Sequence, residues 1–173
     1  NQIQFEQSLQ MALDNARRSG HKLAILLIDF DQFKYVNNAL GYESANEIIK
    51  EAAKRLNQCD WLSGSLARFS GDDFAILIAQ TESDDEVALV AERLRLMCSE
   101  PYRVAGQVFH LTASVGISTY PADGDLVSQL IKHAESAMYH AKDQGRDQIR
   151  FYSTELSEAV SDRMHLERDL RAA

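Results

Sequence analysis

The chain is 173 residues long, enough for one domain with a single hydrophobic core. Acidic residues outnumber basic ones by 26 to 18, and the resulting net charge of −8 disfavours nucleic acid as a partner. The longest apolar run, residues 23–28, is far shorter than the roughly 20 residues that cross a bilayer, which excludes a spanning segment of that kind.

These bulk features set expectations about the compartment. We expect a cytoplasmic segment without membrane contact. Asn1 indicates a fragment of a longer protein, and the sequence leaves open whether that longer protein has a membrane anchor elsewhere. Cys59 and Cys98 lie far apart in the sequence and lack the spacing of metal ligands. They allow a disulfide, but thiols in a reducing cytoplasm are the favoured interpretation.

Helical and strand patterns alternate in the first half of the chain. Apolar residues recur at helical spacing over residues 5–16, and Ser19-Gly20 ends that helix. The mostly apolar residues 23–30 predict a buried central strand. A second helical stripe covers residues 45–56.

The second half of the chain begins with a hairpin. Short apolar runs over 66–69 and 74–79 enclose the polar tetrad Ser70-Gly71-Asp72-Asp73, which is a hairpin signal. The other expected elements are a helix over 87–97, a long strand over 108–120, a helix over 126–141 closed by Gly145, and a strand over 149–152.

The order of these elements predicts the fold class. Without the first helix it is β-α-β-β-α-β, followed by a helix and a strand, which is typical of an α+β, ferredoxin-like sheet that is mainly antiparallel. We expect the helices to pack on one face of that sheet. The tail differs, because its thin apolar stripe buries little and predicts a helix that projects or packs on a neighbour. We therefore expect one domain over 1–152 and a C-terminal helix over 153–173.

Three polar groups within this frame suggest chemistry. Asp29-Phe30-Asp31 ends the buried strand, where Asp29 requires a partner: either a hard cation such as Mg²⁺ or a backbone hydrogen bond. The hairpin tetrad sets two acids beside a glycine that lets a ligand approach, although plain turns use the same residues. Lys142 and Arg146, at i and i+4, share a helix face that suits a phosphate and equally suits a helix C-terminus.

The order and spacing of several motifs resemble one family. Residues 29–37 (D-F-D-Q-F-K-Y-V-N) are similar to its D-x-D-x-F-K-x-x-N run, and residues 68–74 (R-F-S-G-D-D-F) stand where R-x-G-G-D-E-F belongs. Residues 113–118 (A-S-V-G-I-S) resemble its A-S-x-G-I-A strand, and residues 137–146 contain its A-x-Y-x-A-K and G-R motifs. Over residues 1–152 the chain resembles a GGDEF domain, the diguanylate cyclase fold.

The resemblance implies an activity and a metal. Domains of this family have a nucleotidyl-cyclase palm and condense two GTP molecules into cyclic di-GMP, releasing pyrophosphate. Each domain presents one GTP to the other, so the implied active form is a face-to-face homodimer. The implied ligands of Mg²⁺ are Asp29, the carbonyl of Phe30 and Asp72, and the implied catalytic residues are Asp72 and Asp73.

The resemblance also implies six residues that bind GTP. Two of them lie near its phosphates, two clamp those phosphates, and two stand at the guanine edge. In that order they are Phe33, Lys34, Lys142, Arg146, Asn37 and Asn46.

Four positions depart from the family pattern. Asp73 replaces a Glu and retracts the carboxylate by one methylene, and misplacement by about 1 Å can cost roughly 10²-fold in rate. Asn46 replaces an Asp that accepts from guanine, and an amide offers one acceptor oxygen where a carboxylate offers two. Tyr42 replaces a His, and Ser70 replaces the first Gly. These changes predict weak or no cyclase activity.

Two further segments bear on regulation. Trp61 and Gly64 stand where many family members have the Arg and Asp of an R-x-x-D product-inhibition site, so we expect no feedback there. Residues 164–171 resemble the helix that joins a GGDEF domain to a downstream EAL phosphodiesterase domain. An ordinary charged surface helix has the same pattern.

Four hypotheses about function follow from the sequence. The first is a GGDEF domain that binds GTP with Mg²⁺, has weak or no cyclase activity, and regulates an attached EAL domain. The second is an active diguanylate cyclase that tolerates the substitutions. The third is a structural or dimerising module without a ligand, and the fourth is a cyclase fold that accepts another nucleotide, which Asn46 suggests.

Overall fold

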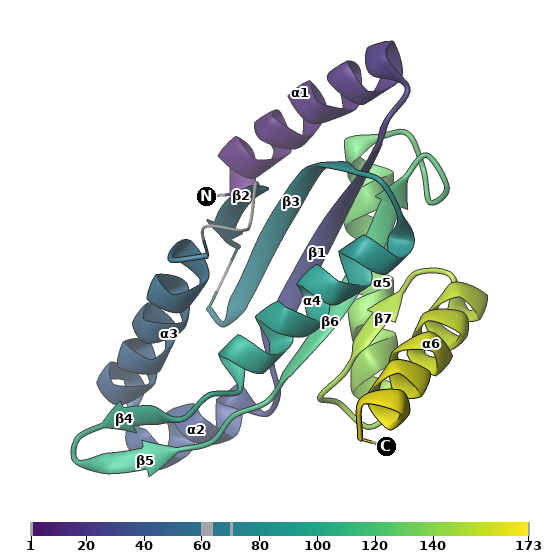
Figure 1. Ribbon diagram of the computed structural model, residues 1–173. Helices are drawn as coiled ribbons and strands as arrows, with labels where there is room; N and C mark the ends of the chain where they lie inside the picture. The colour runs from purple at the N-terminus through teal and green to yellow at the C-terminus, as the bar shows by residue number, and fades with distance from the viewer. Residues whose placement is uncertain (1, 60–63, 70, 173) are drawn as a thin grey trace.

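The core of the fold is a mixed sheet of five strands, drawn in Figure 1. A computed structural model describes residues 2–59, 64–69 and 71–172, with the backbone alone at 64, 65 and 166–172. The strands are β1 (Lys22–Phe30), β2 (Gly64–Arg68), β3 (Asp73–Thr81), β6 (Ala113–Tyr120) and β7 (Ile149–Phe151). They lie in the order β2-β3-β1-β6-β7, and all neighbours are antiparallel except β6 and β7. The predicted α+β fold with a mainly antiparallel sheet is confirmed.

Six helices surround the sheet in the described parts of the chain. They are α1 (Gln2–Ser19), α2 (Phe33–Leu40), α3 (Tyr42–Asn57), α4 (Asp84–Cys98), α5 (Val127–Asp143) and α6 (Thr154–Ala172). Five of them confirm the helices that apolar periodicity predicts. The start of α4 has a local cause: Ser83 Oγ accepts from the Glu86 N–H (3.2 Å), and acidic residues fill the first turn.

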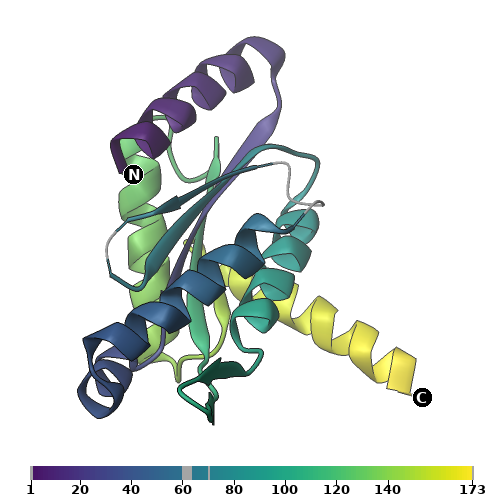
Figure 2. The ribbon, with the colours of Figure 1, turned by 90° about the vertical axis from the view of Figure 1, so that its left-hand side faces the viewer.

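The helices cover both faces of the sheet, so the prediction that they pack on one face is wrong. Even-numbered residues of β1, from Ala24 to Ile28, pack with α3 and α4, whereas the odd-numbered ones, from Leu23 to Leu27, pack with α1 and α5. Figure 2 shows α4 and α5 on opposite sides of the sheet. The physical reason is visible in β1, whose run of apolar residues does not alternate with polar ones and is therefore buried on both faces.

Two local predictions also need correction. The long strand expected over 108–120 is interrupted: β5 (Gln107–Phe109) forms a separate hairpin with β4 (Tyr102–Val104), and β6 begins only at Ala113. The helix α2 was not predicted, because its eight residues are too few to give a clear period. It follows Gln32, whose left-handed conformation (φ 57°) turns the chain sharply out of β1.

A glycine in β6 sets the position of α5. A Cβ on Gly116 would lie 2.1 Å from the Ala134 carbonyl oxygen and 2.3 Å from the Met138 nitrogen, so only glycine permits this close contact. The last turn of α5 thereby passes over the end of β1, where Lys142 contacts Asp29. The close packing of α5 on Gly116 therefore places the Lys142 ammonium next to Asp29.

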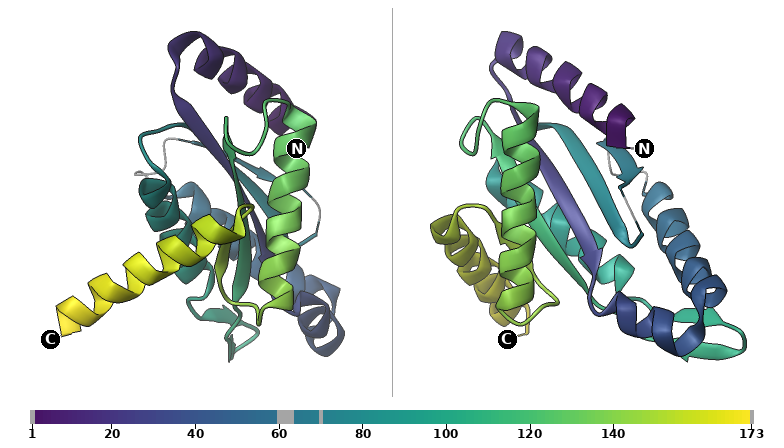
Figure 3. Two further views of the ribbon diagram at one scale, coloured as in Figure 1. Left: turned by 90° about the vertical axis from the view of Figure 1, so that its right-hand side faces the viewer. Right: turned by 180° about the vertical axis from the view of Figure 1, so that it is seen from behind.

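The C-terminal helix α6 is anchored at its start and projects further on. Val160 is buried, and Leu156 and Met164 pack against the same core cluster. Figure 3 shows the helix leaving the body of the domain toward its C-terminal end, as the thin apolar stripe predicts. None of the described helices combines the length and apolar character needed to span a membrane. Cys59 and Cys98 are buried and remain thiols, as predicted.

Candidate functional site: a carboxylate cluster and an adjoining pocket

Three carboxylates meet where β1 ends beside β3. Asp29 pairs across the two strands with Asp73, and Asp72 immediately precedes β3. One carboxylate oxygen of each residue lies within 4.8 Å of the other two. Because like charges directly opposite one another on neighbouring strands repel, a bound cation would stabilise this carboxylate cluster.

Asp29 shows the need for a cation most clearly. Its side chain is buried, and its Oδ2 accepts from the Lys142 ammonium. Its Oδ1 is also buried but has no hydrogen-bond partner among the described residues. An orphan buried carboxylate oxygen is costly, and hard oxygen donors are the ligands that Mg²⁺ prefers. The donor set and the orphan atom together fit a divalent cation.

The electrostatics of the cluster agree with this interpretation. Burial, together with the neighbouring Asp29, raises the pKa of Asp72 to about 7. Burial is likewise the largest cause of the raised pKa of Asp29 and of Asp73, and a neighbouring Asp adds to each. Asp72 is therefore partly protonated near neutral pH, and a cation that binds the cluster must displace that proton.

Asp31, two residues further along, has a different role. Its Oδ1 accepts from Ser114 Oγ (2.6 Å), and its Oδ2 accepts from Thr112 Oγ1 (2.6 Å) and from the Asp147 N–H (3.0 Å). The side chain is buried and fully occupied by these donors. Asp31 therefore ties the end of β1 to the start of β6 and to the turn after α5. The sequence pattern D-x-D gave no sign of this division of roles.

The second part of the site is a small pocket on the other side of the hairpin turn. A cavity of about 50 Å³ is lined by residues of α2, α3, the end of β2 and the turn, namely Phe33, Asn37, Tyr42, Asn46, Ile49, Arg68 and Gly71. The Arg68 Nε–H donates to the Gly71 carbonyl (2.9 Å) and fixes the turn. Gly71 lines the pocket and Asp72 belongs to the cluster, so a single turn joins the two halves of the site.

Comparison with known proteins agrees with this geometry. The family described as "Diguanylate cyclase, GGDEF domain" matches residues 1–148. The chain belongs to the GGDEF family. This GGDEF domain is 35% identical over its whole length to the bifunctional diguanylate cyclase/cyclic di-GMP phosphodiesterase MucR of Pseudomonas aeruginosa, and 34% identical to the cyclic di-GMP phosphodiesterase NbdA of the same species. It covers 25% and 22% of those proteins, so it spans about a quarter of their length.

A solved structure has the same fold. The GGDEF domain of TpbB from Pseudomonas aeruginosa superposes with a TM-score of 0.85 at 32% identity, covering 89% of this chain and 90% of that one. TpbB itself is named a diguanylate cyclase.

The GGDEF signature residues divide between the two halves of the site. The cluster unites Asp29, Asp72 and Asp73 with Lys142, and the pocket brings Asn37 and Asn46 together. The expectation that Lys142 and Arg146 share one helix face is wrong, because α5 ends at Asp143. Arg146 lies in the following turn with a left-handed backbone (φ 62°) and an exposed side chain.

Three other predicted residues lie around the end of β1. The Phe30 ring is buried against Tyr102, with 6.1 Å between ring centroids, and the backbone carbonyl is the one oxygen that a phenylalanine can offer to a metal. Phe33 is buried and lines the pocket, whereas Lys34 is exposed on α2. Ser70 and Trp61 lie outside the described residues.

Proposed function

We propose that this GGDEF domain binds GTP together with Mg²⁺, has weak or no diguanylate cyclase activity, and regulates an attached EAL-type phosphodiesterase domain. The observation that carries the proposal is the buried Oδ1 of Asp29, which has no hydrogen-bond partner among the described residues and lies inside a cluster of three carboxylates. A site of this kind costs stability unless a cation occupies it, which supports a binding function.

In this proposal, one set of residues holds the metal ion of GTP and another set contacts its phosphates. Asp29, Asp72 and the Phe30 carbonyl would hold Mg²⁺, which supplies neutralising charge to the triphosphate when it is bound. Lys142, which neutralises Asp29 in the ligand-free protein, would then be released from that ion pair toward a phosphate. Arg146 would contact the phosphates from the turn after α5, and Phe33 and Lys34 would lie near them.

The guanine would enter the pocket between α2 and α3. Asn37 and Asn46 line it, and Tyr42 at its rim is highly exposed. A volume of about 50 Å³ holds only a few water molecules, so in this proposal the pocket widens when a base enters. We propose that the exposed Tyr42 side chain moves outward when the base binds.

Two substitutions support the proposal of weak activity. Asp73 has a carboxylate one methylene shorter than the family's Glu, and its pKa is raised mainly by burial, which favours the protonated form. Asn46 stands in the guanine pocket with an amide in place of a carboxylate. A donor opposite a guanine donor weakens binding, because a buried polar group is left unpaired.

The regulatory part of the proposal is supported by the relatives. NbdA and the PdeR protein of Escherichia coli (29% identical over 96% of this chain) are both named cyclic di-GMP phosphodiesterases. A solved EAL/GGDEF domain protein from M. capsulatus is 32% identical over 84% of this chain. The segment 153–173, which contains α6, would form the linker to such a domain, and a homodimer would be the form in which any cyclase activity occurs.

The test combines binding and turnover. Calorimetry with Mg²⁺ is expected to detect GTP binding below millimolar concentration and weaker ATP binding, and absence of GTP binding up to millimolar concentration would overturn the proposal. An assay of cyclic di-GMP formation is expected to detect little product with the wild type and more with the Asn46→Asp, Asp73→Glu double variant. Rapid turnover by the wild type would instead identify an active cyclase.

A further inference from the structure

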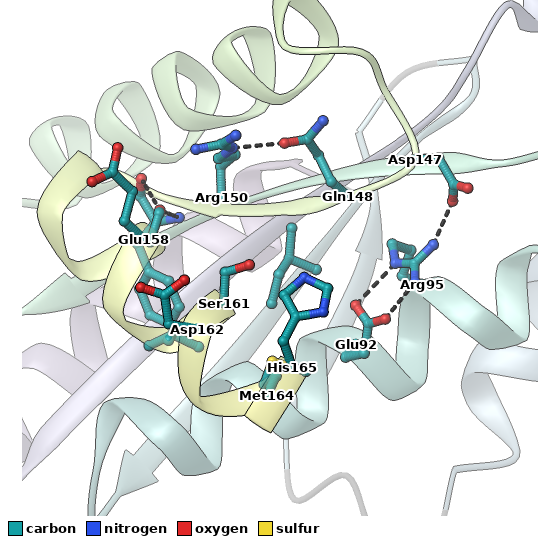
Figure 4. A pocket seen from close by; sticks show the side chains of 14 residues that line it. Glu92, Arg95, Asp147, Gln148, Arg150, Glu158, Ser161, Asp162, Met164 and His165 are labelled. Atoms are coloured by element: carbon teal, nitrogen blue, oxygen red, sulfur yellow. Dashed lines mark hydrogen bonds and ion pairs between the residues drawn. The ribbon is translucent and has the colours of Figure 1, made fainter. Parts of the chain in front are cut away.

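An ionic clasp joins α4 to the turn that follows α5. Its members are Glu92, Arg95 and Asp147, and we call them the Arg95 clasp. The Arg95 guanidinium binds Glu92 through two nitrogens, with Nε donating to Oε2 at 2.9 Å, and it pairs with Asp147 through a third. Figure 4 shows the clasp beside a cavity of about 330 Å³ that α4, β7 and α6 line.

The clasp is mostly buried, which makes it strong and specific. The side chains of Arg95 and Glu92 are 12% and 13% exposed, whereas that of Asp147 is 47% exposed. A bidentate guanidinium–carboxylate pair fixes direction as well as charge, because its two hydrogen bonds are parallel. Glu92 therefore orients Arg95, and Arg95 in turn holds Asp147.

The turn held by the clasp has an unusual backbone. Gly145, Arg146 and Asp147 follow one another with φ of 112°, 62° and 50°. Residues other than glycine rarely adopt such angles, and they persist only where surrounding contacts enforce them. The Arg146 N–H donates to the Ala141 carbonyl (3.0 Å), which closes the helix end but does not fix Asp147.

Asp147 is therefore held from two sides. Its side chain is bound by Arg95 of α4, and its N–H donates to the buried Asp31 carboxylate at the end of β1 (3.0 Å). Arg146 is the residue immediately before it, and Lys142 lies in the last turn of α5. The two contacts fix the turn that carries Arg146, directly after the helix end whose Lys142 contacts Asp29 of the carboxylate cluster.

We propose that Arg95 is a positioning residue for nucleotide binding, because it holds the turn that carries Arg146 in the conformation that meets the triphosphate. The inference rests on the proposed binding of GTP and adds a residue that lies on α4 and is absent from both the cluster and the pocket. Residues that orient a ligand-binding group commonly affect affinity by roughly 10- to 100-fold when they are replaced.

The experiment compares three single variants of the chain. Arg95→Met removes the clasp, and Asp147→Asn breaks the same ion pair from its exposed end while Glu92 and Arg95 stay together. The matched control is Arg163→Met, which breaks the exposed pair between Arg163 and Asp85 (2.7 Å), a contact that also involves α4 but lies away from the turn. Binding of GTP and of guanosine monophosphate, each with Mg²⁺, is measured by calorimetry, and hydrogen exchange is followed over residues 144–148.

The expected result is selective for the triphosphate. Both clasp variants should weaken GTP binding roughly tenfold and change guanosine monophosphate binding less than twofold, with faster exchange in the turn. Arg163→Met should leave all three readouts unchanged. If the clasp variants bind GTP as the wild type does, or lose both nucleotides equally, the inference is overturned while the proposed function stands. If the wild type itself binds no GTP, both are overturned.

Discussion

Asp29 and Asp31 stand two residues apart at the end of β1, yet their surroundings are opposite. Asp31 accepts three hydrogen bonds from Ser114, Thr112 and the Asp147 N–H. Asp29 faces two more carboxylates, has one ammonium partner, and keeps a buried oxygen without a donor among the described residues. Asp31 therefore stabilises the fold by itself, whereas Asp29 requires a bound cation to satisfy its buried oxygen.

The comparison teaches how to distinguish structural from functional acids in one motif. A satisfied buried carboxylate stabilises the fold, so its loss should be felt without any ligand present. An unsatisfied carboxylate among like charges destabilises the free protein, so its benefit should be visible only when a cation is added. The predictions below test these two statements in order of decreasing effect.

The largest effect is expected at Asp31. Asp31→Ala should lower the free energy of unfolding by about 3 kcal/mol, because it leaves two hydroxyls and one N–H without their acceptor. Denaturant unfolding measures the change. The exposed Asp14, which pairs with Arg17 on α1, serves as the control, and Asp14→Ala should cost less than about 0.5 kcal/mol. If Asp31→Ala lowered the free energy of unfolding by less than about 1 kcal/mol, the contrast between a structural Asp31 and a ligand-binding Asp29 would be wrong.

The opposite sign is expected at Asp29. Asp29→Asn should raise the free energy of unfolding of the metal-free protein by about 1 kcal/mol at neutral pH, because the removal of a buried carboxylate from beside two others outweighs the loss of its ion pair with Lys142. Addition of Mg²⁺ and GTP should then stabilise the wild type but not the variant. Destabilisation of the metal-free protein by this change would show that Asp29 resembles Asp31 after all.

The pH dependence of stability should reveal the cluster without mutation of Asp29. Because the pKa of Asp72 rises from 3.8 to about 7 on folding, the folded state holds a proton that the unfolded state has lost between these values. The contribution is therefore present below pH 3.8 and is lost as the pH rises through about 7. Relative to Asp72→Asn, the metal-free wild type should lose about 1 kcal/mol between pH 4 and pH 7. If the difference in the free energy of unfolding between the wild type and Asp72→Asn did not change with pH, it would contradict the raised pKa of Asp72.

The smallest effect concerns Lys142. It neutralises Asp29 in the free protein, so Lys142→Met should strengthen the binding of Mn²⁺ alone by about threefold, or roughly 0.6 kcal/mol. The same variant should weaken the binding of GTP with Mg²⁺, because a phosphate contact is lost. Lys132, which lies on the same helix ten residues earlier, provides the control substitution Lys132→Met. If Lys142→Met weakened the binding of Mn²⁺ and the binding of GTP equally, Lys142 could not be exchanging Asp29 for a phosphate.

Much of this structure could be predicted from the sequence. Helical and strand periods identify four of the five sheet strands within about two residues of their ends. They fail where local signals are short or absent, as in α2 and in the break between β5 and β6. They also fail for the faces of the sheet, because a continuous apolar run such as that of β1 does not say how many helices will cover it.

The candidate site was predictable as a set of residues but not as a network. The motif resemblance selected Asp29, Asp72 and Lys142, and the structure brings them together. It gave no sign that Asp31 would bind Thr112 and Ser114, or that Arg95 would hold Asp147. Such partners lie far apart in the sequence, so no local period encodes them, and only the packing of β6 and α4 on β1 creates the contacts.

The central claim is that Asp29 belongs to a metal site that serves a nucleotide. The most direct measurement is a Mn²⁺ titration in the presence of GTP, followed by electron paramagnetic resonance, on the wild type and on Asp29→Asn. The wild type should bind one Mn²⁺ for each GTP with an affinity at least tenfold above that of the variant. Equal binding of Mn²⁺ and GTP by the two proteins would contradict the account.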